Sequence, residues 1–113
     1  KMVERLARHS LDKLLSGEYN LNKPVVVKCY SNGCHLCHAL KPHFESLASA
    51  TDDVRFFAFN MEDGEGLESK YNFEGVPTLI LIKEGKVTTM PEPDKPHPTY
   101  WYHLNDMKRF VRG

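Results

Sequence analysis

The stretch YSNGCHLCHALKPHF, residues 30–44, places two cysteines three positions apart, and its letters fit three different chemistries. Cys34 and Cys37 form a C-x-x-C pair, which is typical of a redox dithiol. Together with His35 and His38, the same cysteines supply four side chains of the kinds that bind zinc. The run from Cys34 to His38 also spells the C-x-x-C-H pattern of covalent haem attachment.

The segments on either side of the pair favour the dithiol. Residues 23–31 are rich in β-branched side chains and predict a buried strand. A helix is expected from Cys34 to about Ala50, kinked at Pro42. Its apolar stripe consists of Leu36, Leu40, Phe44 and Leu47. At such a strand-to-helix junction, the helix dipole and free N–H groups stabilise a thiolate. Cys34 therefore suits nucleophilic attack, and Cys37, one turn further in, suits resolution.

Metal and haem sites need partners that this sequence does not group. Structural zinc sites usually draw on two spaced ligand pairs. The remaining histidines near or beyond the pair, His43, His97 and His103, are isolated. Haem would require a distal ligand such as a methionine, and a C-x-x-C-H run between a strand and a helix of a βαβ unit is the wrong context. We therefore expect no metal and no cofactor beyond the redox-active Cys34–Cys37 disulfide.

The rest of the chain alternates helices and strands. The expected elements are a helix at 2–16, a strand at 54–61, a short helix within 62–73, strands at 77–83 and 87–90, and a helix at 103–111. A proline-rich segment, residues 91–98, is expected to form an extended surface loop. This order predicts an α/β domain with a mixed sheet covered on both faces.

Length and composition set outer bounds. The 113 residues fit one domain spanning 1–113, and Cys29 fits a small buried residue within an apolar run. Equal numbers of acidic and basic residues, 15 each, argue against nucleic-acid or membrane-surface binding, so we expect neither a nucleic acid nor a membrane as partner. We also expect a monomer. Residues 1–10 lack a signal-peptide core, which favours the cytoplasm. The chain begins with Lys rather than Met, so an oxidising compartment stays open.

Several motifs in order resemble the thioredoxin family. They are VVVKCYSNGCHLC at 25–37, Pro42 five residues past the second cysteine, GVPT at 75–78 and Gly85 in a hairpin turn. The resemblance implies the thioredoxin fold, an α/β architecture with a central mixed sheet of four to five strands flanked by helices on both faces. It also implies a cis bond between Val76 and Pro77.

The resemblance implies a function as well. Members of the family are protein-disulfide oxidoreductases, which act in electron transport and cell redox homeostasis without an organic cofactor. By this likeness, the partners would be protein disulfide substrates and an upstream reductase. The substrate would lie against Val76 and Pro77, with Gly33 and Tyr30 contributing to the recognition surface.

The sequence departs from the family pattern at several positions. His35 and Leu36 replace the usual Gly-Pro, and an imidazole there either lowers the pKa of Cys34 or points to solvent. Lys28 stands where the family carries a buried acid. It either takes part in proton transfer and electrostatic tuning or extends to solvent along its stem. Gly33 replaces a tryptophan, and the proline-rich segment followed by TYWY, residues 99–102, replaces a short turn.

Two further functions therefore remain open beside the reduction or exchange of protein disulfides. The first is a disulfide oxidase or isomerase of an oxidising compartment, which a histidine between the cysteines favours. The second is a redox-inactive binding module of the same fold, in which the aromatic and proline-rich segment contacts a partner.

Overall fold

A computed structural model describes residues 3–113, and its centre is a five-stranded sheet in the order β1-β3-β2-β4-β5. The strands are β1 (Val3–Arg5), β2 (Val25–Tyr30), β3 (Arg55–Asn60), β4 (Thr78–Lys83) and β5 (Lys86–Thr89). Strands β1, β3 and β2 run parallel, whereas β4 is antiparallel to both β2 and β5. The helices are α1 (Arg8–Ser16), α2 (His35–Ser49), α3 (Leu67–Tyr71) and α4 (Leu104–Arg112), and a short 3-10 helix, η1 (Met61–Asp63), follows β3.

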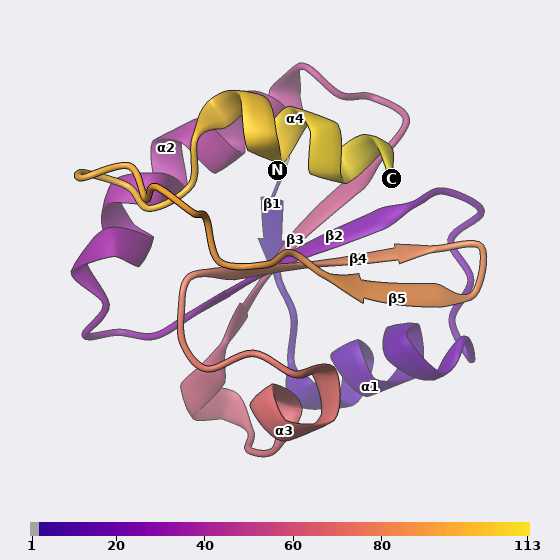
Figure 1. Ribbon diagram of the computed structural model, residues 1–113. Helices are drawn as coiled ribbons and strands as arrows, with labels where there is room; N and C mark the ends of the chain where they lie inside the picture. The colour runs from indigo at the N-terminus through magenta and orange to yellow at the C-terminus, as the bar shows by residue number, and fades with distance from the viewer. Residues whose placement is uncertain (1–2) are drawn as a thin grey trace.

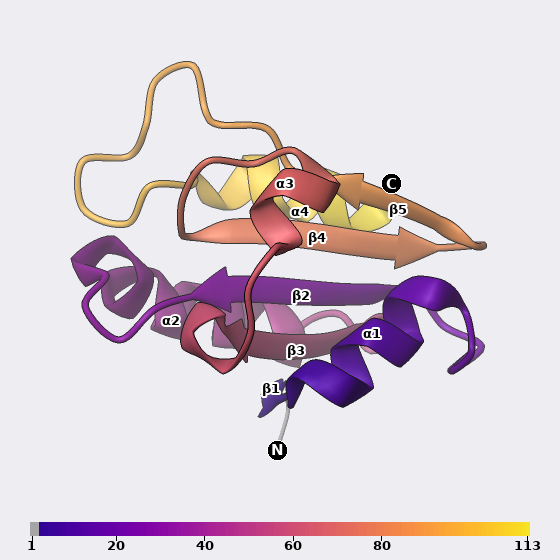
Figure 2. The ribbon, with the colours of Figure 1, turned by 90° about the horizontal axis from the view of Figure 1, so that it is seen from below.

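Helices cover both faces of the sheet, as the sequence predicted. Helices α2 and α4 lie on one face and α1 and α3 on the other (Figure 1), and α1 and α3 stand in front of the strands when the molecule is turned (Figure 2). Because side chains alternate along a strand, β2 contributes to both cores. Val26 packs with α2 and α4, whereas Val25 and Val27 pack with α1 and α3. The parity of β2 therefore directs Lys28 toward α2 and the buried Cys29 toward the opposite face.

The predicted helix at 2–16 is wrong at its start. Val3–Arg5 is a strand, β1, which pairs in parallel with β3, and α1 begins only at Arg8. Leu6 N–H extends this pairing by donating to the Ala58 carbonyl at 2.8 Å. The spacing of Val3 and Leu6 suits a helix locally, but pairing with a strand more than fifty residues away prevails. Residue 2 lies outside the described residues.

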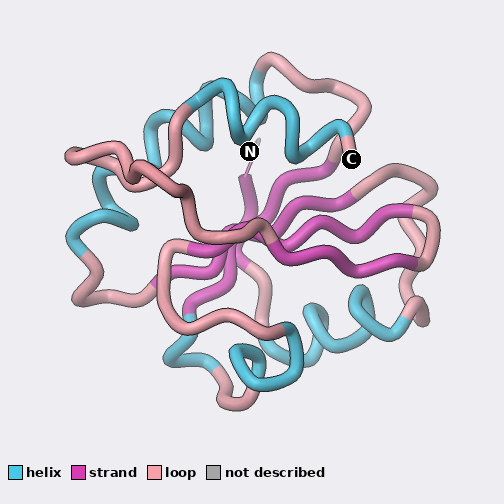
Figure 3. The backbone as a smooth tube through the Cα atoms, in the orientation of Figure 1, coloured by secondary structure: helices cyan, strands magenta, loops and turns pink. Residues whose placement is uncertain are grey.

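The other elements differ from their predicted bounds by a few residues. Pro42 lies inside α2, which still extends to Ser49. The 91–98 segment runs as a loop toward the end of the sheet where α2 begins (Figure 3), and an isolated β-bridge joins His97 to Trp101. No helix among residues 3–113 is both long and apolar enough to cross a membrane.

Candidate active site

The two cysteines of the C-x-x-C pair form a disulfide at the start of α2. Cys34 is the N-cap residue with extended backbone geometry, and its Sγ accepts a hydrogen bond from the Cys37 N–H at 3.1 Å. Asparagine or serine usually fills this position, because a side-chain acceptor satisfies an N–H group that has no helical partner. A sulfur at this site therefore lies where the helix end stabilises negative charge.

The two sulfur-bearing residues differ in accessibility. Cys37 is only 2% exposed, whereas Cys34 is half-buried. The Val76 carbonyl oxygen lies 3.6 Å from Cys34 Sγ, and the Val76–Pro77 peptide bond is cis. Thr78 Oγ1 donates to the Gly75 carbonyl at 2.6 Å and closes this loop. Cys34 Sγ thus lies between the start of α2 and this loop.

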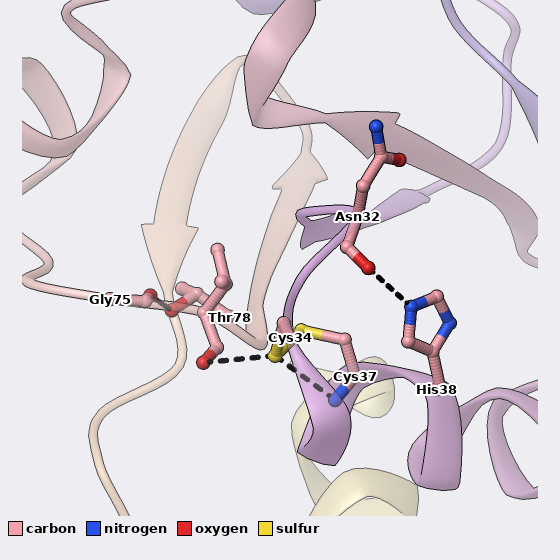
Figure 4. The surroundings of a disulfide bond; sticks show 7 residues. Asn32, Cys34, Cys37, His38, Gly75 and Thr78 are labelled. Carbon is pink, nitrogen blue, oxygen red and sulfur yellow. Dashed lines mark hydrogen bonds between the residues drawn. A yellow bond between two sulfur atoms is a disulfide. The ribbon is translucent and has the colours of Figure 1, made fainter.

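Three polar side chains fix the loop that precedes Cys34. His38 Nε2 donates to the Asn32 carbonyl at 2.8 Å, and Asn60 Nδ2 donates to Asn32 Oδ1 at 2.8 Å. Asn32 in turn donates to Glu62. Figure 4 shows Asn32 and His38 on one side of the disulfide, with Gly75 and Thr78 on the other. Asn32 and Asn60 were not predicted from the sequence, in which the one local signal is that Asn60 is a polar residue at the end of a mostly apolar strand.

Lys28 is buried beside Cys37. It is 5% exposed and, with Cys37, lines a pocket of about 550 Å³ between α2 and the sheet. Its neighbours across the sheet are Ala58 and Leu79, and its Nζ lies 5.2 Å from the centre of the Phe44 ring. Within residues 3–113, Lys28 forms no ion pair.

Burial sets the charge behaviour of this lysine. It lowers the pKa of Lys28 from 10.5 to about 8; nearby Glu45 opposes the shift and Lys41 adds to it. The ammonium group is thus close to losing its proton under mildly alkaline conditions.

Comparison with known proteins identifies the family. The family model described as Thioredoxin matches residues 3–97. The chain belongs to the thioredoxin family. It is 36% identical over 77 residues to a thioredoxin of Mycoplasmoides gallisepticum, which covers 68% of this chain and 73% of that protein. It is 33% identical over 67 residues to a thioredoxin of Acidithiobacillus ferridurans, which covers 58% of this chain and 62% of that one.

Solved structures agree in fold. The oxidised form of mitochondrial thioredoxin 3 from Saccharomyces cerevisiae superimposes with a TM-score of 0.74 at 18% identity, covering 97% of this chain and 93% of that one. The predicted thioredoxin fold is therefore confirmed. Family membership and the Cys34–Cys37 disulfide together identify a thiol–disulfide oxidoreductase.

The structure separates two groups of predicted recognition residues in this thioredoxin-family protein. Val76 and Pro77 line one groove, whereas Tyr30 lines the pocket beside Cys37 on the α2 side. Tyr30 therefore does not line the same groove as Val76 and Pro77, because its side chain points to the same face of the sheet as that of Lys28. Gly33 is exposed, and a Cβ built there meets nothing within 4 Å.

His35, the first residue of α2, is exposed. No hydrogen bond joins its ring to either sulfur in the described part of the chain. Residues 3–113 contain no group of three or more His, Cys, Asp or Glu side chains arranged to hold a metal ion.

Proposed function

We propose that this thioredoxin-family protein reduces or exchanges disulfides of other proteins, with Cys34 as the nucleophile and Cys37 as the resolving cysteine. One observation carries this assignment of roles. Cys34 is reachable from solvent at a helix N-terminus, whereas Cys37 is buried behind it. The thiolate is the attacking species in disulfide exchange, so the accessible sulfur at the positive end of the helix attacks first.

The exchange proceeds in two steps that conserve electrons. The Cys34 thiolate attacks one sulfur of the substrate disulfide; a mixed disulfide forms, and the other substrate sulfur leaves as a thiolate and takes a proton. Cys37, once deprotonated, then attacks Cys34 Sγ, and the Cys34–Cys37 bond replaces the mixed disulfide. The substrate sulfur that was bonded to Cys34 leaves and is protonated. The substrate gains two electrons and two protons, which the dithiol has lost.

An upstream reductase would return the two electrons, and no cofactor beyond the disulfide is needed for this cycle. During exchange, the Val76–Pro77 loop would hold the substrate next to Cys34, since the Val76 carbonyl lies 3.6 Å from its Sγ. The exposed position of Gly33 leaves this side of Cys34 open to a protein substrate, and His35 would act on the Cys34 thiolate through its charge when protonated.

Lys28 would act on the second sulfur. In the disulfide form, Lys28 lacks an ion-pair partner among residues 3–113, yet it shares a pocket with Cys37. Reduction creates a thiol at Cys37, and its thiolate is the anion that a buried ammonium group favours. When neutral, the same amine can accept the Cys37 proton. Both actions promote the resolving step.

The same lysine favours a second candidate function, a disulfide oxidase or isomerase. Stabilising the Cys37 thiolate stabilises the reduced protein, and a dithiol whose reduced form is stabilised is a stronger oxidant. A strong oxidant belongs in an oxidising compartment and a reductase in a reducing one. The reduction potential of the Cys34–Cys37 pair therefore decides both the direction of electron transfer and the compartment in which the protein would act.

Trapping the mixed disulfide tests the proposed roles. A Cys37→Ser variant cannot complete the second step, so incubation with insulin, which contains disulfides, is expected to leave an insulin chain attached to Cys34. Intact mass spectrometry detects this adduct, and dithiothreitol removes it. A Cys34→Ser variant serves as the control and is expected to remain unmodified at Cys37. An adduct that forms only in the Cys34→Ser variant would reverse the two roles.

A further inference from the structure

A groove of about 930 Å³ adjoins the redox centre on the side away from Lys28. The α3–β4 connection, strand β5 and the segment that follows β5 form its walls. Val76 and Pro77 line one part of it, and Trp101 lines another. In Figures 1 and 2, the segment after β5 loops out at the end of the sheet where α2 begins.

Trp101 is held in its position by an unusual backbone. Its φ of 68° lies in the left-handed region, which a bulky residue rarely adopts. Two backbone hydrogen bonds with His97, at 2.9 and 3.0 Å, enforce this conformation. The ring of Tyr100 stacks on His97 and also packs on His43 of α2, at centroid distances of 3.6 and 4.0 Å. The segment is therefore fastened to the active-site helix, which fixes where the indole lies.

The groove and the redox centre are continuous through Val76. Its carbonyl lies 3.6 Å from Cys34 Sγ, and its side of the loop lines the groove. A polypeptide whose disulfide reaches Cys34 across this loop would extend from Val76 and Pro77 along the groove that Trp101 also lines. We propose that Trp101 is a specificity-determining residue, which contacts the substrate polypeptide beside its reactive disulfide and favours an apolar side chain at that position. This inference rests on the function proposed above.

The chemistry of the groove suits a polypeptide. Trp101 is half-buried, with part of its ring packed on the core, and it offers a rigid apolar contact surface. The lining of the groove also carries charges of both signs, Lys70 and Lys86 together with Glu74 and Glu92. An apolar anchor within a polar rim is typical of protein recognition surfaces, and the mixed rim favours no strongly charged ligand. A small disulfide that contacts only Cys34 and Val76 would not reach Trp101.

Kinetics with two disulfides of different size test the proposal. We expect Trp101→Ala to lower kcat/KM for insulin by about tenfold, mainly through KM, as for loss of one aromatic anchor. The rate with 5,5′-dithiobis(2-nitrobenzoic acid), which has no polypeptide, is expected to change by less than about twofold, because Trp101 does not touch the reacting atoms. Trp101→Phe, which keeps an aromatic ring, is expected to recover most of the insulin activity.

A matched control and a binding measurement make the test independent of folding. Tyr19 is an exposed aromatic residue that lines a different pocket with Leu14 and Gly85, and Tyr19→Ala is expected to change neither rate. Trp101 is the single tryptophan of the chain, so its fluorescence reports on the groove directly. In the Cys37→Ser variant, a mixed disulfide with an insulin chain is expected to reduce acrylamide quenching of Trp101 at least about twofold, whereas one with glutathione is expected to leave it unchanged.

Each outcome bears on one proposal. Equal losses with insulin and with the small disulfide in Trp101→Ala, or unchanged quenching in the insulin adduct, would overturn the role of the groove while disulfide reduction stands. A wild-type protein that reduces neither disulfide would overturn the proposed function itself. In that case the Cys37→Ser variant is also expected to form no adduct with insulin or with glutathione.

Discussion

Replacing Cys34 by Ser is expected to lower the rate of insulin reduction by at least about a thousandfold. A serine hydroxyl remains protonated near neutral pH and does not attack a disulfide, and no other described thiol can take its place. Cys37 is 2% exposed, and Cys29 is fully buried on the opposite face of the sheet. The measurement is the turbidity of reduced insulin with dithiothreitol as electron donor, corrected for the uncatalysed reaction.

Cys29→Ala is the matched control for this loss. Burial raises the pKa of the Cys29 thiol to about 12, so it supplies no thiolate near neutral pH, and its removal is expected to leave the rate within about twofold. If Cys34→Ser and the wild-type protein reduced insulin equally slowly, at the uncatalysed rate, the redox-inactive binding module would become the better reading of the fold.

Replacing Lys28 by Met is expected to raise the free energy of unfolding of the oxidised protein by about 2–3 kcal/mol at pH 6. The physical reason is the burial of an ammonium group without an ion-pair partner among residues 3–113. A methionine fills the same space without a charge. Urea unfolding of both proteins measures the difference.

The pH dependence of this difference has a definite sign. The pKa of Lys28 is about 8 in the folded protein, below its ordinary value of 10.5, so the folded state loses this proton first. The penalty is complete below pH 8 and is relieved as the pH rises from 8 toward 10.5, because the unfolded state then binds more protons. The advantage of Lys28→Met is therefore expected to shrink by roughly 1 kcal/mol between pH 6 and pH 9.

Comparing the two proteins at each pH removes the contributions of the other buried groups that titrate in alkali. Lys108→Met, at an exposed position of α4, is the control and is expected to change stability by less than about 0.5 kcal/mol. An advantage of Lys28→Met that stayed constant or grew toward pH 9 would show that Lys28 is not held as a buried ammonium group.

Local patterns in the sequence were sufficient to predict the redox loop. The β-branched run before Cys34 and the apolar spacing after it predict β2 and α2, and the start of α2 places both cysteines. Strand parity also determines the direction of Lys28, because Val26 on the same face belongs to the core beneath α2. What the sequence could not decide was how deeply that lysine is buried, since this depends on Ala58 and Leu79 on the neighbouring strands.

Features that depend on distant contacts were missed. β1 forms only because β3 offers an unpaired edge, and no local signal in Val3–Arg5 reveals it. The hydrogen bond between Asn32 and Asn60 joins residues 28 positions apart. The left-handed backbone of Trp101 follows from its bridge to His97, which the aromatic composition of residues 99–102 does not specify.

The equilibrium of the Cys34–Cys37 pair with glutathione buffers is the most direct test of the proposed chemistry. Alkylation followed by mass spectrometry gives the reduced fraction at each buffer potential. We expect one reversible two-electron transition between about −270 and −120 mV, with values near the first indicating a reductase and values near the second an oxidase. A pair that showed no reversible transition anywhere in this range would contradict a role in protein-disulfide exchange.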